Sequence, residues 1–199
     1  MGRKPLSQEY KDAIKEKLFE VSNRMILETG IENLNIRALC KEVGISYSSF
    51  YDYYNSKDEL IAARIDAMDR YYISRESELR SANAKENIEK FIILYAEFVN
   101  MGNLEIIREV YRMQMYGGVK KVPKEERPLQ TILKRIITEG VENKQFSEDL
   151  SIDDTSRMIL SLCKGMVIDW CSCNGEYSII DSAKSIISAS TLLSNEEEL

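Results

Sequence analysis

The sequence predicts an all-α protein of about nine helices, in which a small N-terminal domain of three helices precedes a helical bundle. Two observations lead to this fold class. Apolar residues recur at intervals of three and four in segment after segment, which is the period of an amphipathic helix. Glycine and proline, which interrupt helices, number only 9 and 3 among 199 residues, and no segment alternates convincingly like a strand.

The N-terminal domain is predicted from residues that begin and end helices. The first helix ends at Gly30, where a left-handed C-terminal cap is expected, and its apolar residues are spaced four, three and four apart: Ile14, Leu18, Val21 and Met25. Asn35 caps a short second helix that ends at Gly44 and has an inner face of Ile36, Leu39 and Val43. Ser46 then caps a third helix, in which Phe50 and Tyr54 lie four residues apart.

The remaining residues predict a bundle of longer helices. Ser56 and Glu59 have the spacing of a capping box, which predicts a helix from about residue 57 to about residue 79. Further apolar stripes predict helices through residues 88–98, 106–113, 129–137, 159–170 and 179–193. Residues 117–128, with two glycines and two prolines, form the one obvious loop. We therefore divide the chain into an N-terminal domain of residues 1–56 and a second domain of residues 57–199.

Composition excludes several classes of protein. The longest apolar runs are far too short to cross a bilayer of roughly 30 Å, and the N-terminus lacks the apolar region of a signal peptide, so we expect a cytoplasmic protein without membrane contact. Histidine is absent, which excludes Ser-His-Asp and Cys-His relays and His-ligated zinc. The net charge of −6 and the pI near 5.0 argue against a protein that coats nucleic acid through bulk charge.

Residues 44–46 join the second and third predicted helices as in a helix-turn-helix, whose tight turn needs a glycine with positive φ. Around this turn, residues 17–60 resemble, without a gap, the DNA-binding domain of the TetR family of transcriptional regulators. The resemblance is carried by Glu28, Gly30, Arg37, Gly44, Ser46, the Phe-Tyr-x-Tyr-Tyr run at 50–54, and Ser56, Lys57, Glu59 and Leu60. It implies a dimeric repressor that binds operator DNA, with no enzyme activity, cofactor or metal.

The third helix carries the side chains that are expected to enter the major groove. Tyr47, Ser48, Ser49 and Tyr51 project from its first turn and a half, and their hydroxyls can donate and accept hydrogen bonds. The resemblance implies contacts to bases or to the sugar-phosphate backbone from Arg37, Ser46, Tyr47, Ser48, Ser49, Tyr51, Tyr53 and Lys57, the last on a phosphate. Two alternatives stay open: Tyr53 can be a core residue like Phe50 and Tyr54, and Arg37 can be a surface ion-pair partner of nearby carboxylates.

Residues 1–60 carry nine basic and ten acidic side chains, so the domain is not basic overall. A locally positive face is still feasible, because Arg3 and Lys4 lie in a free arm and Arg37 and Lys57 lie near helix starts. The N-termini of the second and third helices can also direct backbone N–H groups and positive dipole ends to phosphates.

The bundle is expected to hold a dimer seam and a ligand pocket. A single helix-turn-helix reads too few base pairs, so a two-fold dimer must hold two copies about 34 Å or more apart on a palindromic operator. Helices 159–170 and 179–193 are expected to form the seam, because the first is apolar around most of its circumference; central helices of a monomeric bundle are the alternative. A mostly apolar effector is expected to contact Tyr95, Phe98, Met101, Tyr111, Met115, Met166 and Trp170, with ordinary core packing as the alternative.

Two other functions stay open: an all-helical enzyme that uses carboxylate or cysteine chemistry, and a DNA-binding regulator without an effector. The four cysteines are expected to be reduced. Cys163 and Cys171 lie eight residues apart, about 12 Å on a straight helix at 1.5 Å per residue, which is too far to share a metal ion. Cys171 and Cys173 point to opposite sides if both are helical, so thiol sensing is the less favoured hypothesis.

Overall fold

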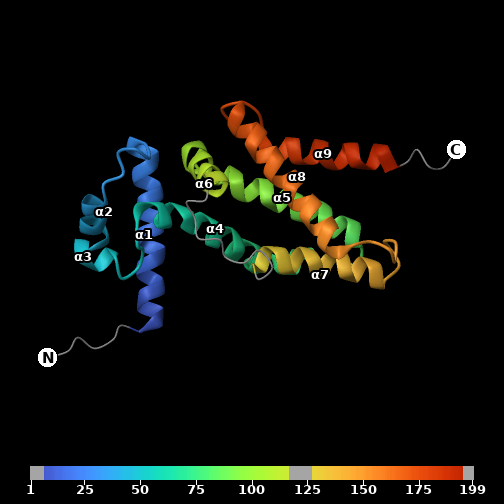
Figure 1. Cartoon of the computed structure of the whole chain (residues 1–199), viewed down its shortest axis with the longest axis horizontal. Helices are drawn as coiled ribbons and strands as arrows, with labels where there is room; N and C mark the ends of the chain where they lie inside the picture. The colour runs from blue at the N-terminus through green and yellow to red at the C-terminus, as the bar shows by residue number, and fades with distance from the viewer. Residues whose placement is uncertain (1–6, 117–126, 195–199) are drawn as a thin grey trace. The chain divides into compact units, whose positions relative to one another are not determined.

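The computed structural model describes residues 7–116 and 127–194, apart from the side chains of residues 190–194. Within these ranges it contains nine α-helices and one 3-10 helix, and no strand (Figure 1). The predicted all-α fold class is confirmed, and most helix breaks fall close to the predicted positions, with the end of α4 as an exception. Most of the predicted loop at residues 117–128, the arm with Arg3 and Lys4, and the acidic C-terminal tail lie outside the described residues.

The chain forms two compact units, which we call the first unit and the second unit. The first unit spans residues 1–65 and 105–120, and its described helices are α1 (Gln8–Thr29), α2 (Ile36–Val43), α3 (Tyr47–Phe50), the start of α4 (Lys57–Ser74) and nearly all of α6 (Leu104–Tyr116). The second unit spans residues 66–104 and 121–199, with the end of α4, the 3-10 helix η1 (Glu76–Leu79), α5 (Ala84–Asn100), α7 (Pro128–Glu142), α8 (Ile152–Ser172) and α9 (Ile179–Ser194).

The N-terminal helices begin and end where their capping residues predict. Gly30 ends α1 with φ 84° and ψ 156°, however, so the left-handed cap predicted there is wrong. The Asn35 side chain accepts hydrogen bonds from the backbone N–H groups of Arg37 (2.9 Å) and Ala38 (3.2 Å) at the start of α2. Gly44 ends α2 with φ 85° and ψ 30°, in the left-handed region. At the start of α3, the Ser46 hydroxyl accepts from the N–H of Ser49 (3.0 Å).

The core of the first unit differs in detail from the predicted stripes. The buried face of α1 is formed by Leu18, Phe19, Ser22 and Ile26, because α1 packs against α2 with a face rotated from the predicted one. The α-helix α3 ends at Phe50, although the following turn still places Tyr54 in the core. The rotated buried face of α1 arises from packing between helices, which local spacing does not specify.

Helix α4 ends earlier than predicted. As expected for a capping box, the N–H of Glu59 donates to the Ser56 hydroxyl (3.0 Å), but the Glu59 carboxylate accepts from the N–H of Asn55 (2.7 Å). The helix stops at Ser74, and the prediction that it continues to about residue 79 is wrong. Arg75 leaves the helical region at φ −107° and ψ 7°, and residues 76–79 form η1, which buries Leu79.

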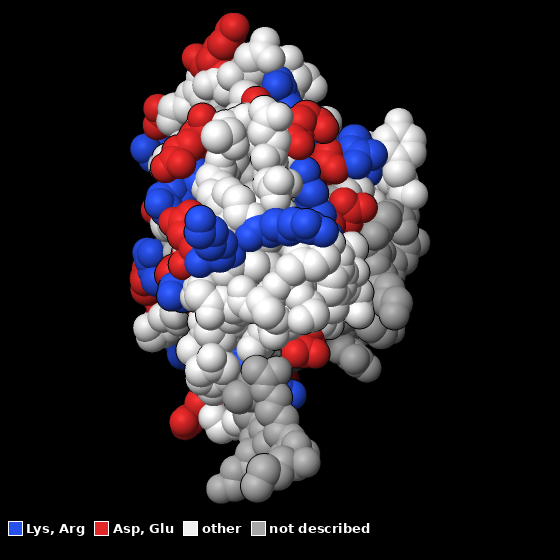
Figure 2. Space-filling view, turned by 90° about the vertical axis from the view of Figure 1, so that its left-hand side faces the viewer, with Lys and Arg blue, Asp and Glu red and all other residues white. Residues whose placement is uncertain are grey.

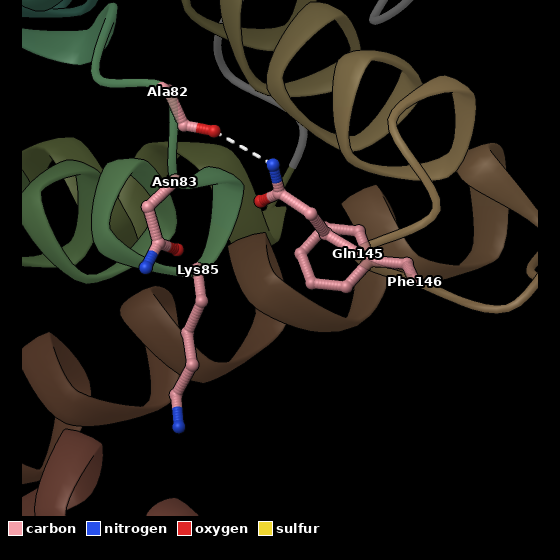
Figure 3. A pocket seen from close by; sticks show the side chains of 5 residues that line it. All are labelled: Ala82, Asn83, Lys85, Gln145 and Phe146. Carbon is pink, nitrogen blue, oxygen red and sulfur yellow. Dashed lines mark hydrogen bonds between the residues drawn. The ribbon is translucent and has the colours of Figure 1, made fainter.

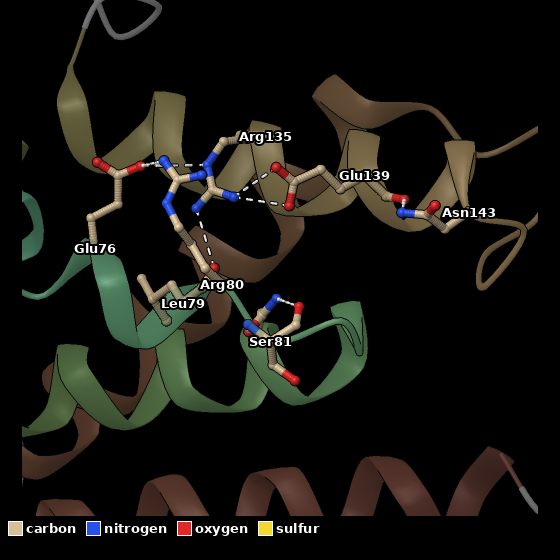
Figure 4. A network of polar contacts seen from close by, with 8 residues as sticks. Glu76, Leu79, Arg80, Ser81, Arg135, Glu139 and Asn143 are labelled. Carbon is tan, nitrogen blue, oxygen red and sulfur yellow. Dashed lines mark hydrogen bonds and ion pairs between the residues drawn. The ribbon is translucent and has the colours of Figure 1, made fainter.

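The second unit is built around α5, which packs against η1, α7, α8 and α9. Its core contains apolar residues that are almost fully buried: Phe91, Leu133, Ile136, Ile137 and Ile179. Figure 4 shows how Arg135 on α7 contacts η1. Its guanidinium donates to the carbonyl of Leu79 (3.2 Å) and lies 3.6 Å from the carboxylate of Glu76, and within α7 it donates to both carboxylate oxygens of Glu139 (2.8 and 2.9 Å). These polar contacts hold η1 against α7.

Candidate nucleic-acid interface

The turn between α2 and α3 spans residues 44–46 and is held by backbone hydrogen bonds. The N–H groups of Gly44 and Ile45 both donate to the carbonyl of Cys40, at 3.0 and 2.9 Å. From α1, the ammonium group of Lys17 donates to the carbonyl of Val43 (3.1 Å) and satisfies the C-terminal end of α2. The turn therefore fixes α3 against α2 as a helix-turn-helix requires.

Helix α3 presents one aromatic and hydroxyl-bearing face to the solvent. Phe50 is buried and anchors the helix, whereas Tyr47 and Tyr51 are 43% and 49% exposed. Ser48 is also exposed and Ser49 is partly exposed. Tyr47, Ser48 and Tyr51, three residues predicted to contact DNA, therefore lie on accessible surface.

The Ser46 hydroxyl is committed to contacts within α3. Besides the N–H of Ser49, it lies 2.9 Å from the Ser48 hydroxyl and 2.7 Å from the Ser49 hydroxyl. A serine hydroxyl has one proton and two lone pairs, and these three contacts use all of them. Ser46 thus fixes the start of the helix, and the outward hydrogen-bonding groups are those of Ser48 and Ser49.

Arg37 lies on the exposed side of α2, with its guanidinium carbon 5.1 Å from the ring centroid of Tyr47. The neighbouring Arg24 on α1 pairs with the carboxylate of Glu42. For the Arg37 side chain, the described part of the chain shows only the contact with the Tyr47 ring. This cation–π geometry favours a DNA contact over the ion-pair alternative, because it leaves the guanidinium N–H groups available.

Two of the predicted residues have structural contacts of their own. Tyr53 is only 6% exposed, and this burial favours the core alternative over a DNA contact, because an enclosed ring has little surface left for a base. Lys57 is partly buried, and its ammonium group donates to the carbonyl of Ile31 (2.6 Å) in the loop that follows α1. A phosphate contact by Lys57 stays a prediction, with this hydrogen bond as a second role.

The charge on this side of the molecule is uneven. Figure 2 shows the face on which α2 and α3 lie: lysine and arginine side chains form a band across its middle, and the surface directly below the band is mostly uncharged. An acidic protein can therefore present a local band of positive charge, as the sequence suggests.

Sequence reasoning missed two features of this surface. The contact of Lys17 with the end of α2 joins residues 26 positions apart, and no local pattern signals it. The hydroxyl oxygens of Tyr47 and Tyr51 lie 2.8 Å apart, and their spacing of four on one helical face would have predicted that contact.

The predicted effector residues fall into different parts of the structure. Tyr95, Phe98, Met166 and Trp170 are buried in α5 and α8, which pack against each other in the second unit. Tyr111 and Met115 belong to α6 in the first unit, and both Met115 and Met101 are well exposed. Four of the seven residues are therefore buried in two helices that pack against each other.

Two hollows in the described second unit have no predicted effector residue in their lining. One, of about 460 Å³, lies at the start of α5 (Figure 3), with Gln145 and Phe146 on one side and Asn83 and Lys85 on the other. The Gln145 amide is already engaged, donating to the carbonyl of Ala82 (2.7 Å) and accepting from the N–H of Ala84 (2.7 Å). The other, of about 330 Å³, is lined by Ile73, Glu76, Pro128, Thr131, Ile132 and Arg135.

The cysteines occupy separate environments. Cys40, Cys163 and Cys171 are buried and Cys173 is exposed, and all four are free thiols. Burial raises the pKa of Cys163 to about 12. In the described ranges, no group of three or more Cys, Asp or Glu side chains has a geometry that could hold a metal ion. A search of the same ranges finds no helix that is both long and apolar enough to span a bilayer.

Comparison with known proteins identifies the N-terminal segment. Residues 18–63 match the family model of the bacterial regulatory proteins of the tetR family. The chain is also similar to the fatty acid metabolism regulator protein of Bacillus subtilis, with 20% identity over 174 residues that cover 85% of this chain and 90% of that protein. The resemblance seen in residues 17–60 is therefore confirmed.

Solved structures share the fold over most of the chain. The transcriptional regulator FadR from Bacillus subtilis, in complex with stearoyl-CoA, aligns with a TM-score of 0.64 and 17% identity over 87% of this chain and 95% of that chain. A TetR transcription regulator from Haloarcula marismortui aligns with a TM-score of 0.67 and 17% identity over 89% and 96% of the two chains.

Proposed function

We propose that this chain is a repressor that binds a palindromic operator as a homodimer and leaves it when a mostly apolar small molecule binds. The match of residues 18–63 to the family model of the bacterial regulatory proteins of the tetR family supports this proposal. The main support for the proposal is the geometry of the helix-turn-helix. Its turn has the left-handed glycine, its recognition helix is capped, and its accessible face offers tyrosine and serine hydroxyls beside an arginine. The groups fit recognition of DNA, and with histidine absent we propose no enzyme activity.

The homodimer is supported by the outer face of α8. Met158, Leu162 and Ile168 are 70%, 43% and 42% exposed, although the same helix buries Met166 and Trp170 on its other side. Exposed apolar side chains at this spacing suit an isologous contact with a second copy of α8, as in a four-helix interface. The dimer would supply the two recognition helices that a palindrome needs.

The effector class is supported by the core of α5 and α8. Tyr95, Phe98, Met166 and Trp170 provide flat and pliable apolar surface, which suits an acyl chain, and the Bacillus subtilis FadR structure contains stearoyl-CoA. The four side chains are buried, so a ligand that contacts them must displace packed side chains, and we infer that α5 and α8 separate as it enters. We propose that this separation is the step that couples ligand binding to DNA release.

The first experiment is selection of bound duplexes from a random-sequence DNA library, followed by affinity and sedimentation measurements on the enriched duplex. We expect a palindromic sequence and two protomers per duplex. Failure to enrich any sequence would refute DNA recognition, and a single protomer bound to half a site would refute the dimer.

The second experiment adds stearoyl-CoA to that complex, with free coenzyme A and stearate as separate arms. Trp170 is the single tryptophan of the chain, so its fluorescence reports directly on the proposed site. We expect stearoyl-CoA to change the fluorescence and to weaken DNA binding about a hundredfold, which requires roughly 2.7 kcal/mol of differential affinity between the two states. A ligand that changes the fluorescence and leaves the DNA affinity unchanged would favour a regulator that does not respond to this class.

A further inference from the structure

Tyr47 at the start of α3 and Tyr51 directly after its end form a hydrogen-bonded pair on the exposed surface. Their hydroxyl oxygens are 2.8 Å apart, and either can donate to the other. Their rings meet edge to face, with centroids 5.5 Å apart and an interplanar angle of 87°. Nearly half of each side chain is exposed, so the pair is accessible to a partner that approaches α3.

The hydrogen bond limits what the two residues can offer to DNA. Each tyrosine hydroxyl has one proton. Because one proton lies between the two oxygens, the pair has one proton left to donate outward, whichever oxygen carries it. Two separate tyrosines would have two. The hydrogen bond with Tyr47 also raises the pKa of Tyr51, because this bond stabilises the neutral phenol relative to the charged phenolate.

The pair is held in place from both helices of the motif. The guanidinium of Arg37 on α2 lies over the Tyr47 ring, 5.1 Å from its centroid. The Tyr51 ring meets the buried ring of Phe50 edge to face, at 5.4 Å. Fixed rings lose less conformational freedom on binding than mobile exposed side chains do.

Resting on the proposed function, we propose that Tyr47 and Tyr51 recognise DNA as one unit that donates a single hydrogen bond to one acceptor, with each hydroxyl needed to orient the other. The acceptor is a ring nitrogen or oxygen of a base edge, or a phosphate oxygen. The two residues therefore contribute to DNA affinity together, and their contributions cannot be independent.

The test is a double-mutant cycle on the duplex enriched from the library. Tyr47→Phe, Tyr51→Phe and the double variant remove only exposed hydroxyls, so circular dichroism and thermal unfolding should match those of the parent. We expect each single variant to weaken binding about threefold to tenfold, and the double variant to weaken it no more than the stronger single variant. Tyr10→Phe, at another exposed tyrosine, is the matched control and should bind like the parent.

The outcomes separate the two proposals. If the double variant loses affinity by the product of the two single factors, or if either single variant binds like the parent, the paired unit is overturned while DNA binding stands. If the parent enriches no duplex, the proposed function fails and the paired unit with it. The affinities of the same variants for an unrelated duplex identify the acceptor. If the variants lose affinity only for the enriched sequence, the acceptor is on a base edge. If they lose affinity equally for both duplexes, the acceptor is a phosphate.

Discussion

Replacing Gly44 tests whether the turn between α2 and α3 depends on backbone conformation. Gly44 has φ 85° and ψ 30°, and a Cβ atom built at this position meets nothing within 4 Å. A substitution there is therefore strained by the backbone alone, without a steric clash. An ordinary L-residue in this left-handed region costs roughly 1 to 2 kcal/mol, whereas asparagine adopts it more readily.

The matched variants are Gly44→Val and Gly44→Asn, which add side chains of similar size and differ in their tolerance of positive φ. Strain at Gly44 can be relieved if the turn shifts and moves α3 away from α2. Since 1.4 kcal/mol corresponds to a factor of ten, we expect Gly44→Val to weaken operator binding about tenfold or more and Gly44→Asn to weaken it less than about threefold.

The assay measures the affinity of each variant for the enriched duplex by fluorescence anisotropy, together with its mass by sedimentation. We expect the dimer to remain intact, because the exposed apolar face of α8 belongs to the second unit and Gly44 to the first. Equal losses from both variants would show that positive φ is not the cause. Parent-like affinity of Gly44→Val would refute the assignment of the turn.

Three further changes test other parts of the structure. Lys57→Met removes the ammonium group and keeps the apolar stem, so the unfolding free energy should fall by about 0.5 to 1.5 kcal/mol through loss of the hydrogen bond to a backbone carbonyl. If Lys57 also contacts a phosphate, the slope of log K against log salt should decrease by about 0.9 per contact, and an unchanged slope would leave only the structural role. Leu162→Glu places a charge on the exposed apolar face of α8 and should give a monomer in sedimentation; an unchanged dimer would exclude this face as the seam. At neutral pH, Cys173 should react with iodoacetamide before Cys163, because a pKa of about 12 leaves almost no thiolate at Cys163; peptide mapping with equal labelling of both would contradict its burial.

The boundaries of the N-terminal helices were predictable because caps act locally. Asn35 and Ser46 accept hydrogen bonds from N–H groups two or three residues ahead, and Gly44 adopts positive φ directly after the last residue of α2. Each of these interactions spans no more than four residues, so the order of residues specifies it almost completely. The helix-turn-helix and its exposed tyrosines were accessible from the sequence for this reason.

Contacts between distant residues were decided by the tertiary structure alone. Lys17 reaches the carbonyl of Val43, and Lys57 reaches the carbonyl of Ile31, each across 26 positions in the chain. The sequence left Tyr53 open between core and surface, and packing buries it. The helical period of 3.6 residues determines the face of the helix on which a side chain lies. The neighbouring helix that covers this face is determined by how all the helices pack together in the core.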